Sequence, residues 1–177
     1  PLSEMPRFGM RMILTKEYDR MSWLGRGPHE NYADRKMSAA VGVYQSGVWE
    51  QYHPYVRAQE TANECDIRWF SLCNTEGEGL LFVGTEPLSV SAWNFMQDDI
   101  NYVPFEIERR HGGSIKKRDL VWVNIDLLQM GVGGDNSWGA QVHPEYTITP
   151  LPRKYSFVIQ PVDTSESISK QARQIWF

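Results

Sequence analysis

Cysteine is scarce in this 177-residue sequence, and long apolar runs and an excess of positive charge are missing; each of these features excludes a class of protein. The two cysteines, Cys65 and Cys73, are too few for a disulfide framework and lack the C-x-x-C spacing of a zinc or redox site. No apolar run approaches the roughly 18 residues that span a bilayer, so the sequence predicts no membrane insertion. The 18 basic residues are outnumbered by 22 acidic ones, which argues against nucleic acid as a partner.

Histidine is also sparse, and its spacing does not suit a metal site. The H-x3-H and H-E-x-x-H patterns are both absent among the four histidines, which are His29, His53, His111 and His143. The sequence therefore predicts no metal ligand and no cofactor on this chain. Residues 135–139 (DNSWG) approach the G-x-S-x-G nucleophile elbow, but the first glycine is Asp135 and no helical pattern follows. We therefore reject a serine nucleophile.

The acidic residues show no pair suited to sugar hydrolysis, which needs two carboxyl groups on opposite sides of one glycosidic bond. Glu106 and Glu108 share one face of any strand that contains them, and Asp98 and Asp99 are adjacent in a predicted turn. Neither pair places an acid and a nucleophile across a substrate. The sequence thus predicts no catalytic residue on this chain.

Alternating apolar residues are the main structural signal that is present. They predict strands over residues 8–14, 88–92, 121–127 and 155–159, with glycine-rich turns between the apolar runs. Helix is scarce: residues 97–101 form one predicted turn, and Ile168, Ala172 and Ile175 mark a short amphipathic helix near the C-terminus. The length suits one domain over residues 1–177, and the pattern predicts an all-β sandwich or barrel.

Trp138 stands out because its neighbours in sequence are small and polar. Glycines at 131, 133 and 134 let the backbone approach a partner closely, and an indole offers a flat apolar face to a sugar ring. Asp135, Asn136 and Ser137 are available for hydroxyl groups. The residues alone leave two interpretations open, a ligand-facing Trp138 and a Trp138 that anchors its own loop. Trp69, Trp93 and Trp122 lie in alternating segments and are predicted to be buried.

Three motifs, in matching order and spacing, resemble one known domain. Residues 23–35 (WLGRGPHENYADR) fit W-x-G-x-G-P-x-E-N-Y-x-D-R, and residues 52–56 (YHPYV) fit Y-x-P-Y-V. Residues 122–126 (WVNID) and 130–138 (MGVGGDNSW) are similar to W-x-N-I-D followed by M-G-x-G-G-D-x-S-W. These motifs are typical of the C-terminal, small-chain domain of bacterial β-galactosidases of glycoside hydrolase family 2. The resemblance covers roughly residues 5 to 160.

The resemblance implies an antiparallel β-supersandwich of the kind shared with galactose mutarotases. It also implies that the chain is truncated at its N-terminus, because the family domain is longer there, and exposed strand edges are then expected. Residues 164–177 run past the family's usual end and form a C-terminal extension, which we expect to pack as a short helix.

The function implied by the resemblance is hydrolysis of terminal β-D-galactose from galactosides such as lactose, with retention of configuration. The catalytic glutamates and Mg²⁺ would lie on a TIM-barrel domain, or a large subunit, that this chain lacks. The chain itself would complete the active-site mouth and stack Trp138 on the sugar, and alone it would be inactive. The segment 30–32 and Arg35 are expected to be structural. The whole enzyme would be a homo-oligomer.

Two other interpretations remain, a stand-alone carbohydrate-binding module and a purely structural interface domain with a buried Trp138. Affinity for free galactose or lactose would favour the first. A loop that touches no sugar would favour the second. The preferred galactoside and the compartment, cytoplasmic or periplasmic in a bacterium, stay open at this point.

Overall fold

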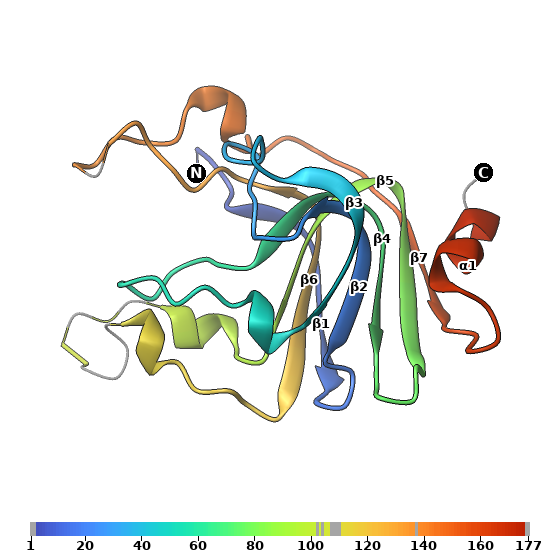
Figure 1. The fold of residues 1–177 in the computed structure, drawn as a ribbon. Helices are drawn as coiled ribbons and strands as arrows, with labels where there is room; N and C mark the ends of the chain where they lie inside the picture. The colour runs from blue at the N-terminus through green and yellow to red at the C-terminus, as the bar shows by residue number, and fades with distance from the viewer. Residues whose placement is uncertain (1–2, 102, 104, 107–110, 137, 176–177) are drawn as a thin grey trace.

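The structure is a computed structural model that describes residues 3–101, 103, 105, 106, 111–136 and 138–175. Its strands form one antiparallel sheet in the order β1-β6-β5-β4-β2-β3, with β7 beside β5 (Figure 1). The strands are β1 (Arg7–Thr15), β2 (Arg20–Gly27), β3 (Ala40–Gly47), β4 (Asn63–Cys73), β5 (Gly79–Trp93), β6 (Leu120–Gln129) and β7 (Phe157–Pro161). The helices are α1 (Ile168–Ile175) and short 3-10 turns at Trp49–Gln51, Gln97–Ile100, Gly112–Ser114 and Pro144–Tyr146.

The connection between β1 and β2 forces the sheet to curl. The two strands lie four places apart in the strand order, which would separate them by about 19 Å in a flat sheet with strands about 4.8 Å apart. Only residues 16–19 join them, in a turn closed by a 3.2 Å hydrogen bond from the Tyr18 N–H to the Thr15 carbonyl. The sheet therefore bends back on itself into a half-open barrel, as the ribbon in Figure 1 shows.

The inner face of the curled sheet holds the main hydrophobic core. Val121, Val123 and Ile125 of β6 point inward and are fully buried, as the alternation of that segment predicted. The rings of Phe70 and Phe82 stack with centroids 4.4 Å apart in the same core. Because these side chains come from strands all round the curl, they bury one another without a second covering layer among the described residues.

The outer face carries two smaller apolar clusters, one covered by loops and the other by α1. At one end, Trp93 and Trp122 lie beneath the loops that follow β3 and β5, with Phe95 and Ile100. At the other end, α1 places Ala172 on Trp69, and Leu81 and Val83 complete the cluster. The predicted burial of Trp69, Trp93 and Trp122 is confirmed, and so is a packed helix within residues 164–175.

The all-β class with a short C-terminal helix is confirmed, while the two-layered supersandwich stays a prediction because one sheet is described. Several boundaries differ from the predicted ones. The strand predicted over residues 88–92 is the last part of β5, which begins at Gly79. β7 begins at Phe157 rather than Tyr155, and the 3-10 turn ends at Ile100. At the sheet margin, β2 is the one partner of β3 among the described strands, and Val41 and Val43 of β3 are 50% and 59% exposed.

Both cysteines, Cys65 and Cys73, are buried and free of disulfide bonds. Burial raises the pKa of each thiol, to about 11 for Cys65, so both stay protonated at neutral pH. Within the described part of the chain, no helix is long and apolar enough to cross a membrane.

The packing of α1 leads to a stability prediction. Ala172→Asp places an unpaired charge in a fully buried position against Trp69, so we expect the free energy of unfolding to fall by about 2–4 kcal/mol. Urea unfolding measures the change. Gln174→Asp, at an exposed position of the same helix, is the matched control and should cost under about 1 kcal/mol. Equal losses in the two variants would show that α1 does not dock through Ala172.

Candidate functional site

The loop that carries Trp138 is firmly attached at its base. We call residues 130–148, apart from 137, the Trp138 loop; it follows β6 and extends from the sheet at the upper left of Figure 1. The Met130 N–H donates to the Pro6 carbonyl at 3.0 Å, and the Gly131 N–H donates to the Tyr146 carbonyl at 2.9 Å. A β-bridge between Met5 and Ile148 closes the far end. The base of the loop is therefore held by the N-terminal segment.

Asp34 fixes the start of the loop from a different part of the chain. Its Oδ2 accepts hydrogen bonds from the Val132 N–H at 3.0 Å and the Gly133 N–H at 2.7 Å. Gly131 permits this approach, since a Cβ there would lie 2.7 Å from the Asp34 Cγ and 2.9 Å from the Tyr146 Cβ. The glycine run that the sequence showed is therefore required for close packing at 131.

The tip of the loop leaves the Trp138 indole in solvent. Trp138 is 92% exposed. Its backbone N–H donates a hydrogen bond to the Asn136 Oδ1 at 2.8 Å. Asp135 lies 2.8 Å from the Nε2 of His143, and this hydrogen bond and the charges of Asp135 and Glu145 raise the pKa of His143. Ser137 lies outside the described residues. The structure thus brings three of the four predicted residues to one tip, with the indole free and not packed into its own loop.

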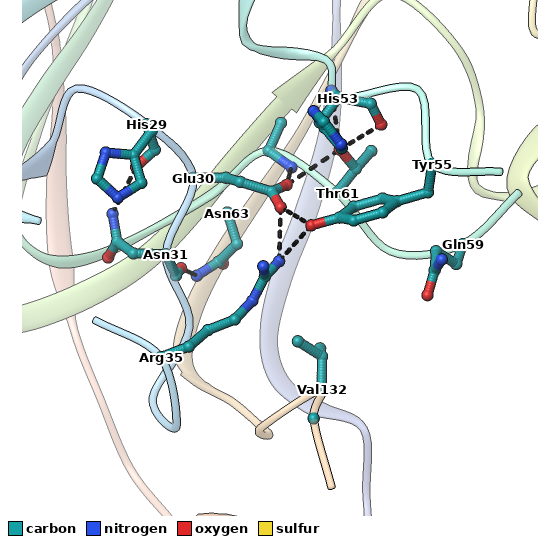
Figure 2. A network of polar contacts seen from close by, with 12 residues as sticks. His29, Glu30, Asn31, Arg35, His53, Tyr55, Gln59, Thr61, Asn63 and Val132 are labelled. Atoms are coloured by element: carbon teal, nitrogen blue, oxygen red, sulfur yellow. Dashed lines mark hydrogen bonds and ion pairs between the residues drawn. The ribbon is translucent and has the colours of Figure 1, made fainter. Parts of the chain in front are cut away.

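A polar network joins the two loops beside the Trp138 loop, and Glu30 is its centre (Figure 2). One carboxylate oxygen of Glu30 accepts from the Tyr55 hydroxyl and, at 2.5 Å, from Arg35. The other accepts from the Thr61 hydroxyl at 3.1 Å and from the Ala62 N–H at 2.6 Å. All four of these hydrogen bonds join Glu30 to neighbouring loops of the same fold. Glu30 therefore has the structural role expected for residues 30–32.

Next to this network, Asn31 is buried and joins the same loop to β4. Its side chain donates to the Glu64 carboxyl at 2.5 Å and accepts from the Cys65 N–H at 2.9 Å. Burial raises the pKa of Glu64 to about 9, and the hydrogen bond from Asn31 only partly offsets it. Glu64 is therefore held as a neutral acid at neutral pH.

Sequence reasoning missed a charged cluster at the point where β1 begins and β6 ends. Arg7 donates to Glu60 at 2.9 Å and lies 3.2 Å from the Asp126 carboxylate. Burial raises the pKa of Glu60 to about 7 and that of Asp126 to about 6, against the opposing effect of Arg7. Gly9 is the one residue in the sequence that indicates close packing at this cluster, because a Cβ at position 9 would lie 2.0 Å from the Asp126 side chain.

Arg7 and Glu60 of this cluster lie at a pocket of about 690 Å³, within the range of small-molecule sites. Arg7 and Glu60 line it together with Arg35 and Tyr55 of the Glu30 network and with residues 130–133. The pocket therefore sits between the Glu30 network and the base of the Trp138 loop. Among the described residues, no group of three or more histidine, cysteine, aspartate or glutamate side chains is arranged to hold a metal ion.

Comparison with known proteins gives a consistent result. A family model described as the β-galactosidase small chain matches residues 1–159. A β-galactosidase of Priestia megaterium is 40% identical over 148 residues, which are 83% of this chain and 14% of that protein. A β-galactosidase of Lactobacillus delbrueckii subsp. bulgaricus is 36% identical over 160 residues, 89% of this chain and 15% of its own length. The chain thus spans about one seventh of the curated relatives that it matches.

The contact between Asp34 and the Trp138 loop yields a dynamic prediction. Asp34→Ala removes the acceptor of the Val132 and Gly133 amides, so their hydrogen exchange should accelerate about tenfold or more. Exchange followed by NMR or mass spectrometry measures it. Asp163→Ala, which removes a comparable acceptor from the Ser165 N–H near α1, should leave these two amides unchanged. Unaltered exchange in Asp34→Ala would contradict the anchoring role.

The raised pKa of Glu64 predicts how stability depends on pH. The unfolded chain releases this proton near pH 4.5 and the folded chain near pH 9, so the contribution of Glu64 to stability is lost as pH rises between these values. The loss reaches about 1.4 kcal/mol per pH unit at most. Glu64→Gln keeps an acceptor for Asn31 and does not titrate.

We therefore expect Glu64→Gln to exceed the parent in stability at pH 8, and the difference to shrink toward pH 5. Urea unfolding at pH 5, 6, 7 and 8 tests this. Glu60 and Asp126 titrate in both proteins, so the difference between the two curves reports Glu64 alone. If the stability of parent and variant changed in parallel with pH, the raised pKa of Glu64 would be refuted.

Proposed function

This chain belongs to the β-galactosidase small-chain family, and from that premise we propose that it forms one wall of the active-site mouth of a β-galactosidase. The observation that carries the proposal is the exposed indole of Trp138 on a loop whose base is fixed at several points. An exposed indole offers a flat apolar face to a ligand, and a held loop binds with a smaller loss of conformational entropy.

In this proposal the hydrolysis itself takes place on a catalytic domain or large subunit outside the chain. Retaining hydrolysis needs a carboxylate that attacks the anomeric carbon and an acid that protonates the leaving oxygen. The carboxylates nearest the pocket already have partners in the fold: Glu30 accepts four hydrogen bonds, and Glu60 and Asp126 both contact Arg7. We therefore propose that the isolated chain is inactive, and that Mg²⁺ belongs to the catalytic domain.

The part played by this chain is to position the sugar. The face of Trp138 would stack on the apolar C–H face of a terminal galactose, while the second carboxylate oxygen of Asp135 and the side-chain NH₂ of Asn136 lie nearby for hydroxyl groups. Such a contact excludes water from one side of the ring. Because it forms equally in the bound substrate and the transition state, it acts on binding more than on the chemical step.

A stand-alone carbohydrate-binding module is the second candidate, and the same exposed indole favours it. In that case Trp138 would bind free galactose or lactose with no other domain present. In a structural interface domain, by contrast, the indole would pack against a neighbouring domain and touch no sugar. Kinetics of the full-length enzyme distinguish these roles.

Trp138→Ala in the full-length enzyme that contains this chain should raise KM for lactose about fivefold, equivalent to about 1 kcal/mol, with little change in kcat. Trp138→Phe should recover most of the affinity. Phe105→Ala, at a side chain that is 95% exposed, is the matched control for loss of a surface aromatic. An unchanged KM would favour the structural role, and a thousandfold fall in kcat at constant KM would contradict stacking.

A further inference from the structure

The pocket at the start of β1 has the features of a binding site in its own right, and Trp138 is not among its lining residues. Three arginines line it, and each is held by an aromatic ring. Arg7 lies over Trp93 at 5.9 Å, Arg11 over Trp122 at 4.6 Å, and Arg35 over Tyr32 at 4.9 Å. Long side chains held in this way lose little further freedom when a ligand binds.

Acceptor groups in the same pocket have no hydrogen-bond partner within the described structure. The Oε1 atoms of Glu60, Gln97 and Gln129 are all buried and unpartnered, and Gln129 is only 7% exposed. Buried acceptors of this kind are costly unless a donor reaches them. The pocket therefore has fixed N–H donors in its lining and, just beneath its surface, oxygen acceptors that have no partner among the described residues.

The balance of charge indicates what kind of ligand fits. Arg7 contacts both Glu60 and Asp126, and Arg35 contacts Glu30, so these carboxylates offset the charges of two of the three guanidinium groups. An anion would lie against these carboxylates, and a cation would lie against the arginines. A neutral group that both donates and accepts suits the site, and a hydroxyl does both.

The walls add apolar surface to this polar floor. Val132 and Met130, from the base of the Trp138 loop, line one side of the pocket, and Tyr55 lines another. Figure 2 shows Arg35, Tyr55, Gln59 and Val132 around the same space. Apolar walls over clustered hydrogen-bonding groups match a ligand with C–H faces and several hydroxyls.

We propose that this pocket binds a neutral saccharide, through Glu60 and Gln129 as acceptors and the ring-held arginines as donors. The site is independent of the stacking at Trp138 and needs no catalytic domain. It lies directly under the Trp138 loop, because Met130 and residues 131–133 line the pocket and also form the base of that loop.

Methyl NMR of the 177-residue chain, labelled at the methionine methyl groups and titrated with lactose, tests the proposal. The Met130 resonance, assigned with Met130→Leu, should shift and saturate. The core Met21, which is 1% exposed, and the surface Met37, which is 92% exposed, serve as internal references and should stay in place. Glucosamine and glucuronate, a cation and an anion of similar size, should bind more weakly than galactose.

Variants then locate the site. Glu60→Gln and Gln129→Leu should each weaken lactose binding about tenfold, whereas Gln174→Leu on the exposed side of α1 should not. Trp138→Ala should leave the Met130 titration unchanged, so failure of the stacking role and failure of this proposal give different results.

Three results would overturn the proposal. They are no Met130 shift up to about 100 mM lactose, full affinity retained in both pocket variants, and loss of the shift in Trp138→Ala. A melting curve shows whether each variant is folded. If Glu60→Gln does not fold, Gln129→Leu and the parent titration decide.

Discussion

The short turn between β1 and β2 is the constraint on which the rest of the molecule depends. It joins strands that lie four places apart in one sheet, and only a curled sheet allows that connection. Within the part of the chain that the structure describes, the curl encloses Trp23, Phe70 and Phe82 without a second layer, and it leaves the outer face to be covered by loops and by α1. It also sets the open end of the sheet, where β1 begins and β6 ends, as the place at which loops from three parts of the chain meet.

Much of this fold could be predicted because several strands have one face toward the core and one toward less apolar surroundings. The alternation over residues 121–127 therefore identified β6, and the spacing of Ile168, Ala172 and Ile175 identified α1. β4 carries a weaker signal, because the adjacent residues Trp69 and Phe70 are buried on opposite faces of the sheet and polar residues such as Glu64 are buried in the same strand. The curl was not predictable, because it follows from the order of strands in space.

The candidate site likewise has one part that local sequence reveals and one part that depends on the arrangement in space. Trp138 could be found from its glycine-rich surroundings and from the motif that contains it, since all the information lies within one loop. The cluster of Arg7, Glu60 and Asp126 could not, because Arg7 and Glu60 are 53 residues apart and each resembles an ordinary surface charge. Their burial arises only when β1, β6 and the loop before β4 come together, and burial is what raises the pKa of the two acids.

The margin of the sheet at β3 bears on how this segment behaves away from its surroundings. Val41 and Val43 are exposed on a strand that pairs on one side only among the residues described, and an unpaired apolar edge is a template for a further strand. Sheet-to-sheet association of separate molecules grows with concentration, whereas a neighbouring segment of the same polypeptide occupies such an edge at any dilution. Solubility of the isolated chain would then be limited by this edge, and Val41 and Val43 are the positions at which charged replacements should improve it.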